Sequence, residues 1–135
     1  MMGLNRMMMK NGAVKVEDGS KEWSWEEVND KTKEFTVPRG VKRLKVVAYV
    51  DYAENEPDAN YSATIKNTTS RKIWGKGFSN SNQYGDNIDH QDINSIVGVT
   101  PNKTYTLHFD CYPTNGVAFS WGKAINDMKP TVEDY

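Results

Sequence analysis

The chain has 135 residues, enough for one domain with a hydrophobic core and too few for two. Its 17 basic and 18 acidic side chains nearly balance, so it lacks the basic excess that is typical of nucleic-acid-binding proteins. The single cysteine, Cys111, excludes a disulfide within the chain and the cysteine-rich kinds of structural zinc site.

Apolar and polar residues alternate with a period of two along much of the chain, which predicts short β-strands with one buried face. The strands expected in the first half are 13–17, 31–37, 41–52 and 61–65. Those expected in the second half are 71–78, 93–99, 104–112 and 117–121. No stretch keeps a period of 3.6 residues, so helix is expected only as single turns near 25–31 or 125–128.

The clearest local signal is the sequence Val-Pro-Arg-Gly between the expected strands 31–37 and 41–52. Pro38 has a fixed φ and no N–H donor, and Gly40 can adopt a positive φ, so together they predict a tight turn between strands. Two alternating sets are expected to face a single core, and they are Leu44, Val46, Ala48 and Val50, then Tyr105, Leu107, Phe109 and Cys111.

Polar segments interrupt the strands, and the two candidate binding loops among them are 54–60 and 79–92. About eight or nine short strands at a spacing of roughly 8–12 residues are typical of a sandwich or barrel. We therefore predict an all-β fold, an antiparallel β-sandwich that is jelly-roll-like. The expected organisation is an N-terminal extension over 1–12, the sandwich over 13–122 and a C-terminal tail over 123–135.

Residues 34–50, with the sequence EFTVPRGVKRLKVVAYV, resemble the opening hairpin of the glycine-rich domains of bacteriophage tail and tail-fibre proteins. Those domains begin with the pattern F-T-V-P-x-G-V-x-x-[IL]-x-V. The chain departs from them after Val50, where DYAENEPDANY replaces the dense glycine runs, and it holds 10 glycines in all. The resemblance implies a non-enzymatic structural or receptor-binding component of a phage or prophage tail, working as a homo-oligomer such as a trimer.

Residues 99–112, with the sequence VTPNKTYTLHFDCY, resemble a recurring edge of jelly-roll carbohydrate-binding modules. A similar phrase, V-T-P-G-x-T-Y-T, occurs near the end of the phage glycine-rich domains. Both resemblances imply a compact antiparallel sandwich. The alternative function is therefore a carbohydrate-binding module or lectin-like domain of a bacterial protein.

Aromatic and amide side chains gather around the loop WGKGFSNSNQYGDN. Sugar sites combine flat aromatic faces with hydrogen-bonding amides, because a pyranose ring has an apolar face and a polar rim. The candidate ligand-binding residues are Trp74, Asn82, Gln83 and Tyr84. The alternative for Trp74 is a place in the core, since large aromatic residues dominate the cores of sandwiches.

The same loop contains three carboxylates at a spacing of three, Asp86, Asp89 and Asp92. Ca²⁺ takes six to eight oxygen ligands, so these residues are a candidate calcium site. The spacing is not that of an EF-hand, and the alternative is a solvated loop that protects a neighbouring strand edge. Ca²⁺ is the one cofactor that we consider.

The sequence offers little for catalysis. The Gly-x-Ser-x-Gly pattern of a nucleophile elbow is absent, so we expect no enzyme. His108 alternates with Thr106 and Asp110 on a polar face, and we expect a solvated imidazole there. Cys111 is expected to be a buried, inert thiol.

The expected partners are other copies of the chain, other virion tail proteins and a cell-surface glycan, with no nucleic acid. No window holds the approximately 20 apolar residues of a membrane span, and the N-terminal sequence MMGLNRMMMKNG is not a secretory signal. We therefore expect no membrane insertion, and a location in the virion or on an extracellular surface.

Overall fold

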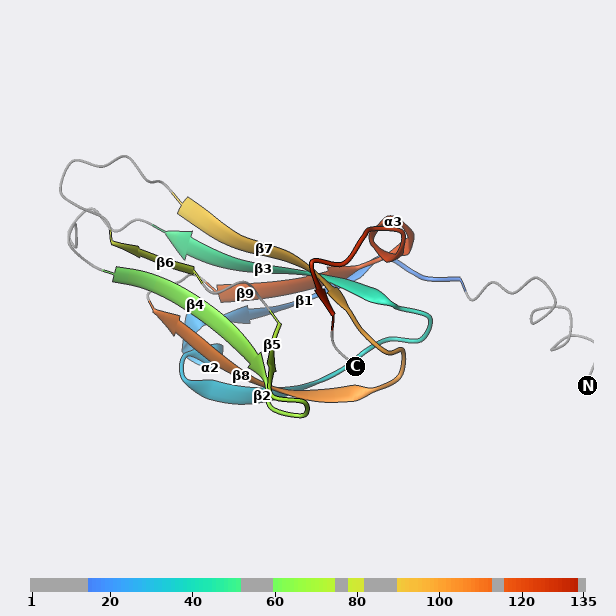
Figure 1. The fold of residues 1–135 in the computed structure, drawn as a ribbon, viewed down its shortest axis with the longest axis horizontal. Coiled ribbons are helices and arrows are strands. Elements are labelled where there is room, and N and C mark those ends of the chain that lie inside the picture. Colours follow the sequence, from blue (N-terminus) through green and yellow to red (C-terminus); the bar gives the residue numbers. More distant parts are fainter. Residues whose placement is uncertain (1–14, 52–59, 75–77, 82–89, 113–115, 134–135) are drawn as a thin grey trace, which may run out of the picture.

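The computed structural model describes residues 15–51, 60–74, 78–81, 90–112 and 116–133. They form two β-sheets packed face to face, with two short helices at the periphery (Figure 1). The predicted all-β, antiparallel sandwich is confirmed, and its jelly-roll character stays a prediction. No helix in this part of the chain is long and apolar enough to cross a membrane.

The first sheet has the strand order β1-β9-β3-β7-β10. Its strands are β1 (Gly19–Ser24), β9 (Gly116–Trp121), β3 (Arg43–Asp51), β7 (His90–Gly98) and β10 (Val132–Glu133). All neighbouring pairs are antiparallel except β10 and β7, which are parallel. β3 lies at the centre, so both of its backbone edges are paired, one with β9 and the other with β7.

The second sheet has the order β2-β8-β4-β5, and β6 pairs with β4 beside β5. Its strands are β2 (Lys31–Thr36), β8 (Thr104–Tyr112), β4 (Asn60–Asn67), β5 (Lys72–Ile73) and β6 (Phe78–Ser81). The helices are α2 (Trp25–Val28), between β1 and β2, and α3 (Lys123–Asn126), between β9 and β10.

Aromatic side chains from both sheets fill the core. The ring of Phe119 lies 5.1 Å from Trp23, 5.2 Å from Phe35 and 5.8 Å from Trp74, measured between centroids. The predicted inward-facing residues are buried wherever their side chains are described, and they are Leu44, Val46, Ala48, Tyr105, Leu107 and Phe109. The side chains of Val50 and Cys111 lie outside the described part.

The predicted turn at Pro38–Gly40 is confirmed, but it does not close a hairpin. The amide of Val41 donates to the carbonyl of Pro38 at 3.2 Å, and Gly40 has a φ of 78°, as a type II turn requires at its third residue. The strands on either side belong to different sheets, because β2 pairs with β8 whereas β3 pairs with β7 and β9. Val37 and Val41 are both buried, so the turn carries the chain across the edge of the core.

Two expected strands differ from those observed. Residues 15–17, the described part of the expected strand 13–17, are not in a strand, and β1 at Gly19–Ser24 begins within Asp18-Gly19 instead of a strand ending there. The expected strand 71–78 contains β5 and the start of β6, with residues 75–77 between them outside the description. β1 escaped prediction because it is an edge strand on which Trp23 is the one buried residue, so its alternation is weak.

The segment expected as a C-terminal tail packs against the first sheet. The side chain of Asn126 accepts hydrogen bonds from the amides of Lys42 (2.9 Å) and Arg43 (3.3 Å) and donates to the carbonyl of Gly40 (2.9 Å). The Thr131 hydroxyl accepts from the amide of Ile96 at 2.9 Å, and β10 follows at once. Residues 123–133 are therefore part of the sandwich.

Candidate functional site

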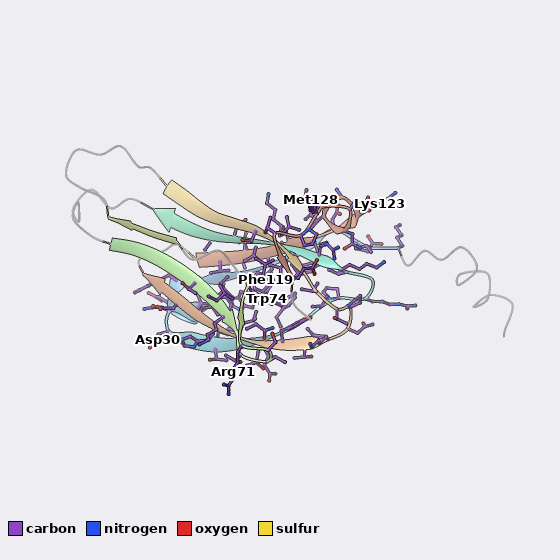
Figure 2. The ribbon with its side chains drawn as sticks, in the orientation of Figure 1. Asp30, Arg71, Trp74, Phe119, Lys123 and Met128 are labelled. Carbon is purple, nitrogen blue, oxygen red and sulfur yellow. The ribbon has the colours of Figure 1, made fainter. Side chains whose placement is uncertain are left out.

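The candidate sugar-stacking residue Trp74 lies in the core. Its side chain is fully buried, and its ring contacts Tyr105 at 4.7 Å and Phe119 at 5.8 Å between centroids. Figure 2 shows Trp74 and Phe119 together between the two sheets. An indole with no exposed surface cannot stack on a sugar, so the expected ligand contact at Trp74 is corrected to a core position.

Most of the other candidates lie outside the described residues. This holds for Asn82, Gln83, Tyr84, Asp86 and Asp89, whose roles stay predictions.

The last carboxylate of the expected calcium loop belongs to a strand. Asp92 lies in β7 opposite Tyr49, so the expected loop over 79–92 is wrong at both of its ends, where β6 and β7 run. Within the described ranges, no three His, Cys, Asp or Glu residues come close enough to hold a metal ion. Calcium binding by the three aspartates stays a prediction.

The structure does bring polar side chains together on the outer face of the second sheet. We call this the threonine face, and it consists of Thr32, Thr36, Thr104, Thr106 and His108. They share the outward side of β2 and β8 with the exposed carboxylates Glu34 and Asp110, and the inward positions of these strands include Phe35, Tyr105 and Phe109. The hydroxyls of Thr36 and Thr104, which are directly opposite in the register, share a hydrogen bond of 2.8 Å.

His108 is the centre of a hydrogen-bonded chain on this face. Its Nε2 lies 3.2 Å from Oδ1 of Asp30, and its Nδ1 lies 3.3 Å from the hydroxyl oxygen of Thr32. Thr32 is the direct cross-strand partner of His108. Asp30 has a φ of 52° at the junction between α2 and β2, and this left-handed conformation is one that Asp tolerates better than most residues. The imidazole is partly exposed, at 35%.

The two ring nitrogens of His108 therefore each have a polar partner, a carboxylate at Nε2 and a hydroxyl at Nδ1. This order of hydroxyl, imidazole and carboxylate is the one that activates a nucleophile in hydrolases. Hydrolases also need N–H donors aimed at a developing oxyanion. Strand amides lie in the plane of the sheet, so the backbone of β2 and β8 offers no such donor above the threonine face.

The threonine face also borders an exposed cation. Lys66 of β4 lies opposite His108 on the other side of β8, and its side chain is exposed. A ligand on this face would therefore meet hydroxyls, an imidazole, several carboxylates and an ammonium group.

Sequence reasoning placed His108 correctly on a polar face but missed its partners Asp30 and Thr32. The alternation of Thr32, Glu34 and Thr36 in the sequence is a signal that could have identified the exposed side of this strand. The pairing of Thr32 with His108, however, joins residues 76 positions apart and depends on the strand register.

Comparisons with known proteins give no relative for this chain. No protein-family model matches it, and neither a curated protein nor a solved structure matches it.

Proposed function

We propose that the protein is a non-enzymatic structural or receptor-binding component of a phage or prophage tail, presenting a surface to a cell-surface partner. The observation that carries this proposal is that the two segments with the phage-like sequences form one structural unit. The amide of Val37 donates to the carbonyl of Lys103, and the amide of Asn102 donates to the carbonyl of Val37, both at 2.9 Å.

The two turns have the same design. Asn102, with a φ of 66°, follows Pro101 in the turn between β7 and β8, as Gly40 follows Arg39 in the turn between β2 and β3. Both turns cross between the sheets, and they lie side by side because β2 pairs with β8 and β3 pairs with β7. The two segments thus meet at one end of the sandwich, which supports treating them as parts of one resemblance.

The strand order supports a jelly-roll form of the sandwich. Strands from the beginning and end of the chain interleave as β1-β9-β3-β7 in one sheet and β2-β8-β4-β5 in the other. Successive strands β1, β2, β3 and β4 alternate between the sheets, and so do β7, β8 and β9. Jelly rolls of this kind are common in viral capsid and lectin domains, which agrees with both candidate functions.

This function places the protein in the virion, in contact with further copies of itself and with other tail proteins, and requires no cofactor. Its test is fractionation of particles released by the bacterium that carries the gene. An antibody against the chain should detect it in the density-gradient fraction that contains tailed particles. A chain that remains entirely in the soluble fraction, while an antibody against a known tail protein labels the particles, would refute the proposal.

A carbohydrate-binding module is the second candidate, and the threonine face favours it. The sheet holds the hydroxyls of this face at fixed positions, and the hydrogen bond to His108 fixes the side chain of Thr32. These side chains would therefore lose little conformational entropy when they bind the polar groups of a ligand. The affinity of one site should be weak, about −4 to −8 kcal/mol, and increased by several copies.

The test is a glycan array with the wild-type protein, His108→Ala and, as a control on the outer face of the other sheet, Ser20→Ala. Loss of binding in His108→Ala alone would support a sugar site on the threonine face. Binding that both substitutions leave intact would exclude this face and leave the predicted Tyr84 loop, to be tested by Tyr84→Ala.

A further inference from the structure

The turn between β4 and β5 is fixed beside the threonine face by hydrogen bonds. The amide and the hydroxyl of Thr68 both donate to the carbonyl of Thr106, at 2.8 Å and 2.9 Å. The hydroxyl of Thr69 accepts from the amide of Thr106 at 3.1 Å. The buried side chain of Asn67 accepts from the amide of Thr69 and donates to the hydroxyl of Ser70, both at 2.9 Å. The path of this turn is therefore set without a ligand.

Arg71 ends this turn in an unfavourable backbone conformation. Its φ of 61° lies in the left-handed region, which glycine and asparagine adopt with less strain than arginine. The side chain is exposed, and Figure 2 shows it projecting from the second sheet, away from the core. In the part of the chain that the structure describes, no ion pair involves Arg71. Local strain at an exposed side chain points to a role for its guanidinium.

Lys66 is a second cation at this margin of the threonine face. It lies on β4, directly opposite His108 of β8 on one side and Ile73 of β5 on the other, so the three side chains share the outer face of the sheet. Lys66 is exposed, and so is half of Ile73. Arg71 precedes Ile73 by two residues. An anionic group above this margin would therefore meet both cations.

The carboxylates of the same face lie on the side of β2 and β8. Glu34 is opposite Thr106, and Asp110 follows His108 by two residues on β8. Asp30 contacts the imidazole of His108. A ligand with one anionic group and several hydroxyls finds a partner for each, because the cations bind the anion and the carboxylates accept from the hydroxyls. A uniform polyanion such as nucleic acid would be repelled by the carboxylates.

We propose that the threonine face binds an acidic glycan, whose carboxylate or phosphate group is held by Arg71 and Lys66. The planar guanidinium of Arg71 suits bidentate recognition of either group. Hydroxyls of the same glycan donate to Glu34 and Asp110, and Ile73 contacts its apolar C–H groups. The inference rests on the proposed contact with a cell-surface glycan, and it adds the class of glycan and the residues that select it.

The test is a glycan array on which each carboxylate- or phosphate-bearing oligosaccharide is paired with its neutral counterpart. The variants are Arg71→Asn and Lys66→Gln, and the control is Arg39→Asn, which removes an exposed arginine from the turn between β2 and β3. Thermal melts accompany the array. Asparagine suits the left-handed conformation, so Arg71→Asn should melt at the same temperature as the wild type or higher.

The wild type and the control should bind acidic glycans at least about tenfold more tightly than the neutral counterparts, and each variant should lose about tenfold in that affinity. The acidic class that is bound, carboxylate or phosphate, identifies the anionic group.

Four results would overturn the proposal: no acidic glycan bound by the wild type, equal binding of acidic and neutral partners, an Arg71→Asn variant that binds like the wild type, or one that melts at a lower temperature. A short DNA duplex bound as tightly as the acidic glycan would also overturn it. Particle fractionation tests the tail assignment separately, so a chain found in particles without a preference for acidic glycans would refute this inference alone.

Discussion

Phe119 joins the two sheets, so its truncation tests the packing of the whole sandwich. Its side chain is fully buried, and it contacts Trp23 and Phe35 edge to face and Trp74 and Phe109 at a tilt. Replacing a buried Phe by Ala costs about 3–5 kcal/mol. Each favourable ring pair adds about 0.5–1.5 kcal/mol beyond its buried area. Phe119→Ala should therefore lower the free energy of unfolding by about 4–5 kcal/mol, near the upper part of that range.

The assay is urea unfolding followed by tryptophan fluorescence, because Trp23 and Trp74 both contact the substituted ring. Phe119→Leu should lose about 1–1.5 kcal/mol, since it keeps most of the volume and loses the ring contacts. Ile73, which is 50% exposed, provides the control, and Ile73→Ala should change stability by about 0.5 kcal/mol or less. A loss below about 1.5 kcal/mol for Phe119→Ala, with an unchanged slope against urea, would refute the packing described for the core.

Three further substitutions test the junctions of the fold. Gly116→Ala should destabilise strongly in thermal melts, because a Cβ there would collide with the carbonyl of Trp23; a melting temperature like that of the wild type would contradict the β1–β9 pairing. The hydrogen bond from the Ser24 amide lowers the pKa of Glu27. The stability that the ionised Glu27 contributes is therefore lost as the pH falls below 4.5, the ordinary pKa of a glutamate, and Glu27→Gln should flatten this acid dependence of stability. Asn126→Ala should cost about 1–3 kcal/mol and speed hydrogen exchange at the amides that Asn126 accepts from, whereas unchanged exchange would show that α3 is not docked.

The strands that could be predicted from the sequence are those in which bulky apolar residues alternate with polar ones. Val46 and Phe109 lie on strands with three or more buried residues at spacing two, and their inward orientation could be read directly. The turn at Gly40 was also predictable, because its chemistry is local. The sheet that each flanking strand joins was not, since this depends on pairing with β8 and β7, far along the chain.

Polar contacts account for the parts that sequence reasoning missed. The C-terminal segment is fixed by the side-chain hydrogen bonds of Asn126 and Thr131, which leave no periodic pattern. The hydrogen bonds of His108 depend on the strand register, which places Thr32 opposite His108, and on the left-handed conformation of Asp30. From the sequence alone, a single aromatic residue such as Trp74 can be interpreted either as part of the core or as part of a sugar-binding site.

Immunogold electron microscopy of released particles would test the proposed tail function most directly. An antibody against this chain should place gold at the tail or tail fibre of intact particles, in several copies per particle. Particles that carry no gold while a control antibody labels their tails, or gold confined to material without particles, would contradict the assignment.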